Sequence, residues 1–173
     1  LTLPWPAQPW PSGAALGLAA HDPPQRQRGG RKEGLRVLQD RKLVYEVLVF
    51  ERQLETVALF CARHDRHWLV LDHVGKPAVP NWAYTADDWI EYICEVAGLP
   101  HVMCKLSGLV TETDWAHAGG VSPADSKIIW TCFDHALDAF GPHRLMYGSD
   151  WPVCQLAAPY DVVHGLVHRW AKS

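Results

Sequence analysis

The sequence contains no long apolar run, no surplus of basic residues and none of the common nucleotide or hydrolase motifs. No stretch approaches the roughly 18 apolar residues that a membrane-spanning helix requires, so no membrane segment is predicted. The 16 Lys and Arg residues are outnumbered by 19 Asp and Glu residues, so no overall field would attract nucleic acid. GxGxxG, Walker A, HExxH and GxSxG motifs are absent. These absences argue against nucleic-acid and membrane partners.

Cysteine is sparse, and no CxxC pair occurs among the five cysteines of the chain. This excludes the usual pattern of a zinc ribbon and of a thioredoxin-type redox site. Five widely spaced cysteines do not make a disulfide framework in a chain of this length. We therefore expect reduced thiols in the core of a cytoplasmic protein.

The first 33 residues differ in composition from the rest of the chain. They contain six prolines, which cannot donate a backbone hydrogen bond, and they end in the basic stretch 26–32. We predict a disordered, proline-rich leader at 1–33 and a folded domain at 34–173. Because the chain begins with Leu1, we expect either a removed leader or an incomplete translation.

From Gly34 onward, short apolar runs alternate with segments of helical periodicity. Three successive strand–helix units of this kind predict an α/β protein with a parallel sheet. Thr85 is the expected N-cap of one helix, and Ser122 with Asp125 favours the start of another. The expected strands are 43–50, 68–72, 102–106 and 144–148, and the expected helices are 53–63, 86–97, 123–140 and 160–171.

Polar residues gather where these expected strands end. Asp72 and His73 follow one strand, Lys105 and Ser107 close the next, and Ser149 and Asp150 follow the last. In parallel sheets, ligands bind beyond the carboxyl ends of the strands. The sequence therefore predicts an active site at this edge.

His73 and Asp150 are the residues best suited to catalysis at this edge. Asp150 could act as a general base that takes a proton from water, and His73 could polarise a carbonyl, bind a metal or relay protons. A structural interpretation is also open, in which Asp150 caps the following segment and His73 closes a turn before Gly75.

Lys105 is unusual because it interrupts an apolar strand. A buried lysine needs a partner or must lose its charge, and Glu46 in the strand 43–50 is the candidate partner. Lys105 could bind a substrate carboxylate or stabilise an oxyanion. Alternatively, it points into a polar barrel interior or to solvent.

Two histidine pairs are further candidates for metal binding. His64 and His67 flank a loop, and His164 and His168 stand four residues apart on an expected helix. Neither pair has an obvious third ligand, which a zinc site needs. A solvated surface is the favoured interpretation for both.

Four segments of the chain carry a resemblance to a known family: YEVLVFERQL (45–54), LDHVGKP (71–77), CKLSGLVTETDW (104–115) and FGPHRLMYGSDWPVC (140–154). They resemble the amidohydrolase-related family of metal-dependent hydrolases, and in particular its sugar-lactone hydrolases of the fuconolactonase type. The resemblance extends over about residues 34–170.

The resemblance implies a partial or distorted (β/α)8 TIM barrel of the metal-dependent hydrolase type, which would hydrolyse a small lactone or a related cyclic ester or amide. Asp150 matches the aspartate that activates water, and His73 matches a histidine that faces the metal or the carbonyl. If zinc or manganese binds, these two residues are the implied ligands; an enzyme without metal is the alternative. The implied substrate-binding residues are Arg36, Tyr45, Lys105 and Trp151.

The sequence departs from the family in two respects. The His-x-His pair with which the family begins is absent, and 173 residues are fewer than the roughly 200 to 250 of a complete barrel. The alternative to a hydrolase is therefore a catalytically impaired fragment or pseudoenzyme that acts as a binding or interaction protein. Because an incomplete barrel has open strand edges, a homo-oligomer is a further expectation.

Overall fold

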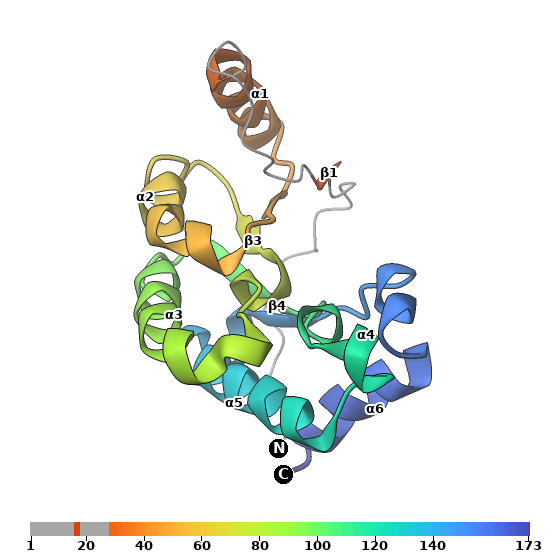
Figure 1. Ribbon diagram of the computed structural model, residues 1–173. Coiled ribbons are helices and arrows are strands. Elements are labelled where there is room, and N and C mark those ends of the chain that lie inside the picture. Colours follow the sequence, from red (N-terminus) through yellow and green to blue (C-terminus); the bar gives the residue numbers. More distant parts are fainter. Residues whose placement is uncertain (1–15, 18–27) are drawn as a thin grey trace.

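The computed structural model describes residues 16–17 and 28–173 (Figure 1). These residues form a five-stranded, wholly parallel sheet with the strand order β1-β2-β3-β4-β5. A parallel sheet in chain order, with a helix after each strand, is the arrangement of a (β/α)8 barrel. The predicted α/β fold and partial barrel are confirmed. The strands are β1 (Leu16–Gly17), β2 (Tyr45–Val47), β3 (Leu69–Leu71), β4 (Val102–Leu106) and β5 (Leu145–Tyr147).

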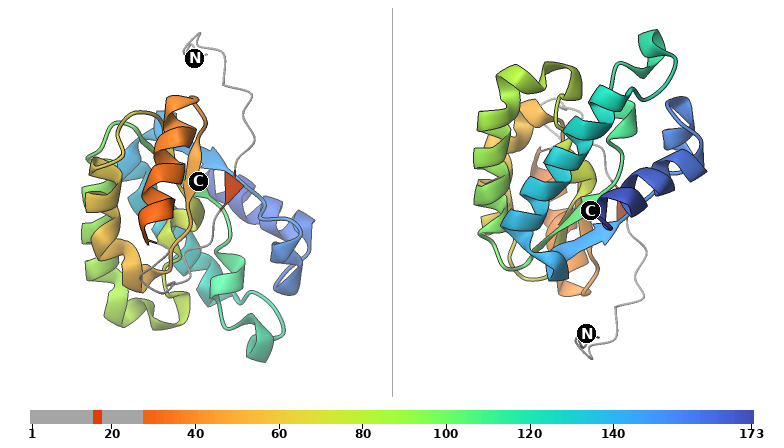
Figure 2. Two further views of the ribbon diagram at one scale, coloured as in Figure 1. Left: turned by 90° about the horizontal axis from the view of Figure 1, so that it is seen from above. Right: turned by 90° about the horizontal axis from the view of Figure 1, so that it is seen from below.

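Helices form a layer outside the strands, as Figure 2 shows. Helix α2 contacts α3, α3 contacts α5, and α5 contacts α6. Short 3₁₀ segments connect several strands to their helices, and two of them, Asp72–Gly75 and Val110–Glu112, lie at the carboxyl ends of β3 and β4. The helices are α1 (Arg28–Asp40), α2 (Val57–Ala62), α3 (Trp82–Ala97), α4 (Trp115–Ala118), α5 (Pro123–Phe140) and α6 (Tyr160–Trp170).

Burial alternates along β4, and this alternation distinguishes the face of the sheet that packs in the core from its inner face. Val102, Cys104 and Leu106 are buried, whereas Met103 and Lys105 between them are half-buried. Because successive strand residues point to opposite faces, the buried set packs under the helix layer. Lys105 therefore lies on the inner face, as the polar-interior interpretation expected.

Several predicted elements are confirmed, and others differ at their ends. The predicted bounds of the strand 102–106 and of the helix 123–140 are those observed, and Ser122 and Asp125 form a capping box at the predicted start of that helix. Strand β2 covers only part of 43–50, and a 3₁₀ segment begins directly after Phe50. The predicted helix 53–63 is divided between that 3₁₀ segment and α2.

The prediction that Thr85 caps a helix is wrong. Helix α3 begins one turn earlier, at Trp82, with Asn81 in the N-cap position. The indole of Trp82 packs edge-on against that of Trp89, with ring centroids 5.3 Å apart. Trp82 also lies 6.5 Å from the ring of His135 on α5, and this tertiary contact stabilises a first turn that the local pattern did not indicate.

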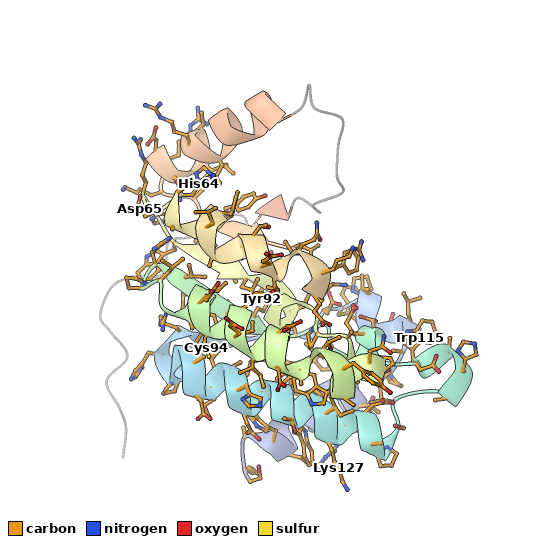
Figure 3. All side chains as sticks on the ribbon, turned by 60° about the vertical axis from the view of Figure 1, so that its left-hand side comes forward. His64, Asp65, Tyr92, Cys94, Trp115 and Lys127 are labelled. Atoms are coloured by element: carbon orange, nitrogen blue, oxygen red, sulfur yellow. The ribbon has the colours of Figure 1, made fainter. Side chains whose placement is uncertain are left out.

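The predicted leader at 1–33 falls mostly outside the described residues. Helix α1 begins at Arg28, so the predicted boundary between 33 and 34 lies within this helix. Gln39 anchors the end of α1, because its buried side-chain amide donates a 2.6 Å hydrogen bond to the carbonyl of His64. His64 itself lies half-buried beside α1 (Figure 3), and His67 is half-buried as well, so both are partly covered at the predicted solvated surface.

All five cysteines are free, and four of them are buried. Cys94 is the exception to the prediction of core thiols, because it lies exposed on α3 (Figure 3). Burial raises the pKa of the Cys61 thiol to about 12, so this thiol remains protonated and unreactive. Among the described residues, no helix is long and apolar enough to cross a membrane.

Candidate functional site

His73 and Asp150 meet at the carboxyl edge of the sheet. His73 follows β3 and Asp150 follows β5, and Nε2 of His73 lies 3.9 Å from Oδ1 of Asp150. Both side chains are largely buried, at 12% and 19% exposure. The expected convergence of these two strand-end residues is present. The backbone carbonyl of Asp150 also accepts a 2.8 Å hydrogen bond from the amide of Cys154, so Asp150 closes the following turn through its main chain.

Ser107, directly after β4, contacts the other side of the His73 ring. Its hydroxyl lies 2.8 Å from Nδ1 of His73, and Ser107 is itself buried. One ring nitrogen is thus occupied by Ser107, and the other faces Asp150. A ring held at one nitrogen has a defined orientation, and the Ser107 hydroxyl can either donate to Nδ1 or accept from it.

The backbone of His73 adopts a left-handed conformation that continues over four residues. The φ angles of His73, Val74, Gly75 and Lys76 are 55°, 51°, 70° and 49°. For non-glycine residues this conformation costs about 1–2 kcal/mol each, so surrounding contacts must hold the turn in place. One of these is the 3.1 Å hydrogen bond that the Trp89 indole donates to the Val74 carbonyl. The turn interpretation of His73 is therefore also correct.

Gly108 allows the imidazole to occupy its position. A Cβ atom at Gly108 would lie 2.4 Å from Nδ1 of His73, and the φ of Gly108 is +65°. Both the space and the backbone conformation therefore require glycine here. No pattern in the sequence indicates this contact, because Gly108 and His73 lie in two different loops.

Burial lowers the pKa of His73 to about 4, although the nearby Asp150 carboxylate acts in the opposite direction. The charges of Lys76 and Lys105 also lower this pKa. The imidazole is therefore neutral at neutral pH. A neutral ring can donate a hydrogen bond to a carbonyl or ligate a metal, but it does not titrate in the range that a proton relay at neutral pH needs.

Lys105 forms an ion triad on the inner face of the sheet. Its ammonium lies 2.6 Å from Glu46 Oε1 and 2.7 Å from Asp72 Oδ1. Burial acts to lower the pKa of Lys105, but the hydrogen bonds to Asp72 and Glu46 outweigh burial and raise it. The predicted pairing with Glu46 is confirmed, and Asp72 is a second partner that the sequence did not indicate. With Glu46 and Asp72 as its two neighbours, the ammonium group, which has three donors, keeps at least one for a ligand.

The remaining predicted substrate-binding residues lie in different places. Trp151 adjoins Asp150 and is 64% exposed. Tyr45 faces the helix layer, with its ring 6.4 Å from that of Phe60 on α2. It therefore lies on the face of the sheet opposite Glu46. Arg36 lies on α1, exposed and 3.8 Å from Asp40 of the same helix. The structure thus brings Lys105 and Trp151 to this edge, and it does not bring Tyr45 or Arg36 there.

The chemistry of the donors at this edge suits a divalent metal only in part. A neutral imidazole and a carboxylate are typical zinc ligands, and Ser107 is a suitable outer partner for His73. A catalytic zinc site takes three protein ligands, whereas residues 16–17 and 28–173 contain no group of three candidate ligands. His73 and Asp150 therefore fit part of a metal site. His164 and His168 stack on the exposed face of α6 with ring centroids 5.7 Å apart, as expected for a surface pair.

Comparison with known proteins gives a consistent family. The amidohydrolase family matches residues 7–171 of the chain. An L-fucono-1,5-lactonase from Burkholderia multivorans is 59% identical over 145 residues, which cover 81% of this chain and 48% of the relative. An L-fucono-1,5-lactonase from Burkholderia ambifaria is 36% identical over 118 residues, covering 68% of this chain and 38% of the relative. The chain thus spans about half the length of the relatives it matches, or less.

Solved structures agree with this result. The crystal structure of an amidohydrolase from Burkholderia multivorans with bound zinc is 58% identical, with a TM-score of 0.77 over 81% of this chain and 49% of that protein. Amidohydrolase 2 from Bifidobacterium longum subsp. infantis shares the fold at 22% identity, with a TM-score of 0.58 over 79% of this chain and 47% of that protein. The chain belongs to the amidohydrolase family.

Proposed function

We propose that the protein hydrolyses a small sugar-acid lactone, or a closely related cyclic ester or amide. The observation that carries this proposal is the placement of the Asp150 carboxylate 3.9 Å from Nε2 of a buried, neutral His73. The similarity to L-fucono-1,5-lactonases supports a 1,5-lactone of a sugar acid as the substrate.

In the proposed reaction, Asp150 takes a proton from a water molecule as the water oxygen attacks the lactone carbonyl carbon. The carbonyl π bond opens to an oxyanion, and a tetrahedral intermediate forms. The carbonyl then reforms and the bond to the ring oxygen breaks. The protonated Asp150 returns its proton to that oxygen, which leaves as a hydroxyl group and releases the open-chain acid.

His73 polarises the carbonyl in this scheme. With the Ser107 hydroxyl donating to Nδ1, Nε2 carries the proton and can donate it to the developing oxyanion. The low pKa of His73 keeps the ring neutral, so it acts as a hydrogen-bond donor and not as a charged acid. Lys105, through its remaining N–H, and the exposed Trp151 are the proposed contacts to the substrate. Tyr45 and Arg36 are not among the proposed substrate contacts, because Tyr45 packs against Phe60 and Arg36 lies beside Asp40 on α1.

A divalent metal, zinc or manganese, is a second part of the proposal. His73 and Asp150 would be two of its ligands, with His73 Nδ1–H then donating to Ser107. Such an ion polarises a carbonyl and lowers the pKa of water. Because the described residues supply only two ligands, no step above depends on the ion. A cytoplasmic location is proposed with this function and agrees with the five free thiols.

The alternative function is non-catalytic binding of a small molecule or of a protein partner. The absence of a His-x-His pair from the sequence favours it, because His73 and Asp150 alone do not supply the three protein ligands of a catalytic zinc site. A homo-oligomer that covers the open strand edges belongs to the same alternative.

The test is hydrolysis of a panel of sugar-acid lactones by the purified chain, followed with a pH indicator. Each lactone is tested after chelation and after addition of zinc or manganese, beside Asp150→Asn. We expect turnover of at least one 1,5-lactone, reduced at least about 100-fold by Asp150→Asn. A cooperatively folded chain without turnover of any lactone would support the binding alternative.

A further inference from the structure

The left-handed turn that carries His73 ends at Lys76, whose side chain reaches two other loops at the same edge. Its ammonium lies 2.7 Å from Oε1 of Glu112, in the 3₁₀ segment after β4. The same ammonium lies 5.1 Å from the ring centroid of Phe50, in the loop after β2. One side chain thus joins the loops that follow three successive strands.

The ion pair between Lys76 and Glu112 is not an ordinary surface pair. Both side chains are only 18% exposed, so water screens the interaction less than it screens an exposed pair. The Lys76 backbone is itself in the left-handed region, with φ of 49°, and its amide donates a 2.8 Å hydrogen bond to the His73 carbonyl. Holding the Lys76 side chain therefore holds the end of the turn whose first residue is His73.

We propose that Lys76 and Glu112 are positioning residues for the proposed hydrolysis. Their ion pair clamps the left-handed turn, and the turn directs the His73 imidazole toward Asp150. Neither residue contacts the reacting atoms in this account. Without the clamp, the turn relaxes toward ordinary backbone conformations, and His73 leaves its place between Ser107 and Asp150.

The first arm of the test does not depend on turnover. Amide hydrogen exchange of Lys76 and of Leu69 is measured by NMR on the full chain. Leu69 is the reference, because its amide donates a 3.0 Å hydrogen bond to the His101 carbonyl and lies outside the turn. Glu112→Gln should speed exchange of the Lys76 amide about tenfold, equivalent to about 1.4 kcal/mol, and that of Leu69 less than about twofold. Lys76→Arg keeps the charge and should remain close to the unsubstituted chain.

Asp40→Asn is the matched control, because it removes the carboxylate of an exposed ion pair with Arg66, 2.9 Å long, far from the turn in sequence. It should change neither amide. Unchanged exchange at Lys76 in Glu112→Gln would overturn the clamp. Equal acceleration at Lys76 and Leu69 would overturn it too, since the ion pair would then act only on global stability.

The second arm rests on the proposed function. In the lactone assay, Glu112→Gln should lower kcat about tenfold and change KM less than about twofold, because misplacing a catalytic group affects the reaction more than binding. Lys76→Arg should retain kcat. Faster exchange at Lys76 with an unchanged kcat would refute the positioning role. If the chain hydrolyses no lactone, the proposed function fails, and the exchange measurement alone decides whether the clamp exists.

Discussion

Replacing Gly108 by alanine tests the packing at the centre of the site. The new Cβ would lie 2.4 Å from Nδ1 of His73, well inside van der Waals contact, so the buried imidazole must move. Alanine must also adopt the φ of +65° that glycine has here. Movement of the ring breaks the 2.8 Å contact with Ser107.

The expected loss of stability is the sum of these effects. A left-handed alanine costs about 1–2 kcal/mol, a lost hydrogen bond about 1 kcal/mol, and forcing a side chain out of a packed site about 1–3 kcal/mol. Gly108→Ala should therefore lower the free energy of unfolding by about 3–6 kcal/mol. Lactone turnover should be lost with it.

Gly119→Ala is the matched control for this substitution. Gly119 has φ of +71°, and a Cβ there would meet nothing within 4 Å. It should therefore cost only the backbone term, about 1–2 kcal/mol. Urea unfolding followed by tryptophan fluorescence measures both variants. Equal destabilisation by the two substitutions would refute the close packing of His73 against Gly108.

Three further predictions follow from the burial of charged and titratable groups. Lys105→Met leaves Glu46 and Asp72 without their counter-charge and should cost about 3 kcal/mol in urea unfolding at pH 7; a neutral result would contradict the ion triad. Cys94 should be the single thiol that an alkylating reagent modifies in the folded chain, giving one adduct by intact mass, and a second adduct before unfolding would contradict the burial of the others. With a chelator present, the contribution of His73 to the free energy of unfolding should be complete above pH 6.5 and should fall by about 3 kcal/mol on acidification through pH 4. The reason is that its folded pKa of about 4 lies below its ordinary value of 6.5. The difference in stability between the chain and His73→Gln in urea titrations measures this contribution, and a pH-independent difference would disprove the low pKa.

The sequence was most informative where local pattern and tertiary structure agree. The apolar run 102–106 and the capping residues Ser122 and Asp125 predicted β4 and α5 at their observed bounds. The ends of parallel strands meet at one edge of a sheet, so His73 and Asp150 could be brought together from their positions alone. The charge of Lys105 within an apolar strand likewise indicated a partner such as Glu46.

Features that depend on contacts between loops were not predictable from the sequence. One such feature is the close packing of Gly108 against His73, and another is the ion pair of Lys76 with Glu112. Each joins residues more than 30 positions apart. The left-handed turn contains three non-glycine residues, His73, Val74 and Lys76, that local propensity would not place there, and tertiary contacts hold it. Arg36 and Tyr45 were carried over by resemblance, and the structure places them away from the His73–Asp150 edge.

The central claim is that His73 and Asp150 act as one catalytic unit. The most direct test is a double-mutant cycle with His73→Gln and Asp150→Asn, in which kcat/KM for lactone hydrolysis is measured for all four proteins. We expect each single substitution to lower kcat/KM by about 100-fold or more. The double variant should be no worse than the more damaging single one, because residues that act as a unit are non-additive. Losses that multiply in the double variant, or a kcat/KM that Asp150→Asn leaves unchanged, would contradict the account.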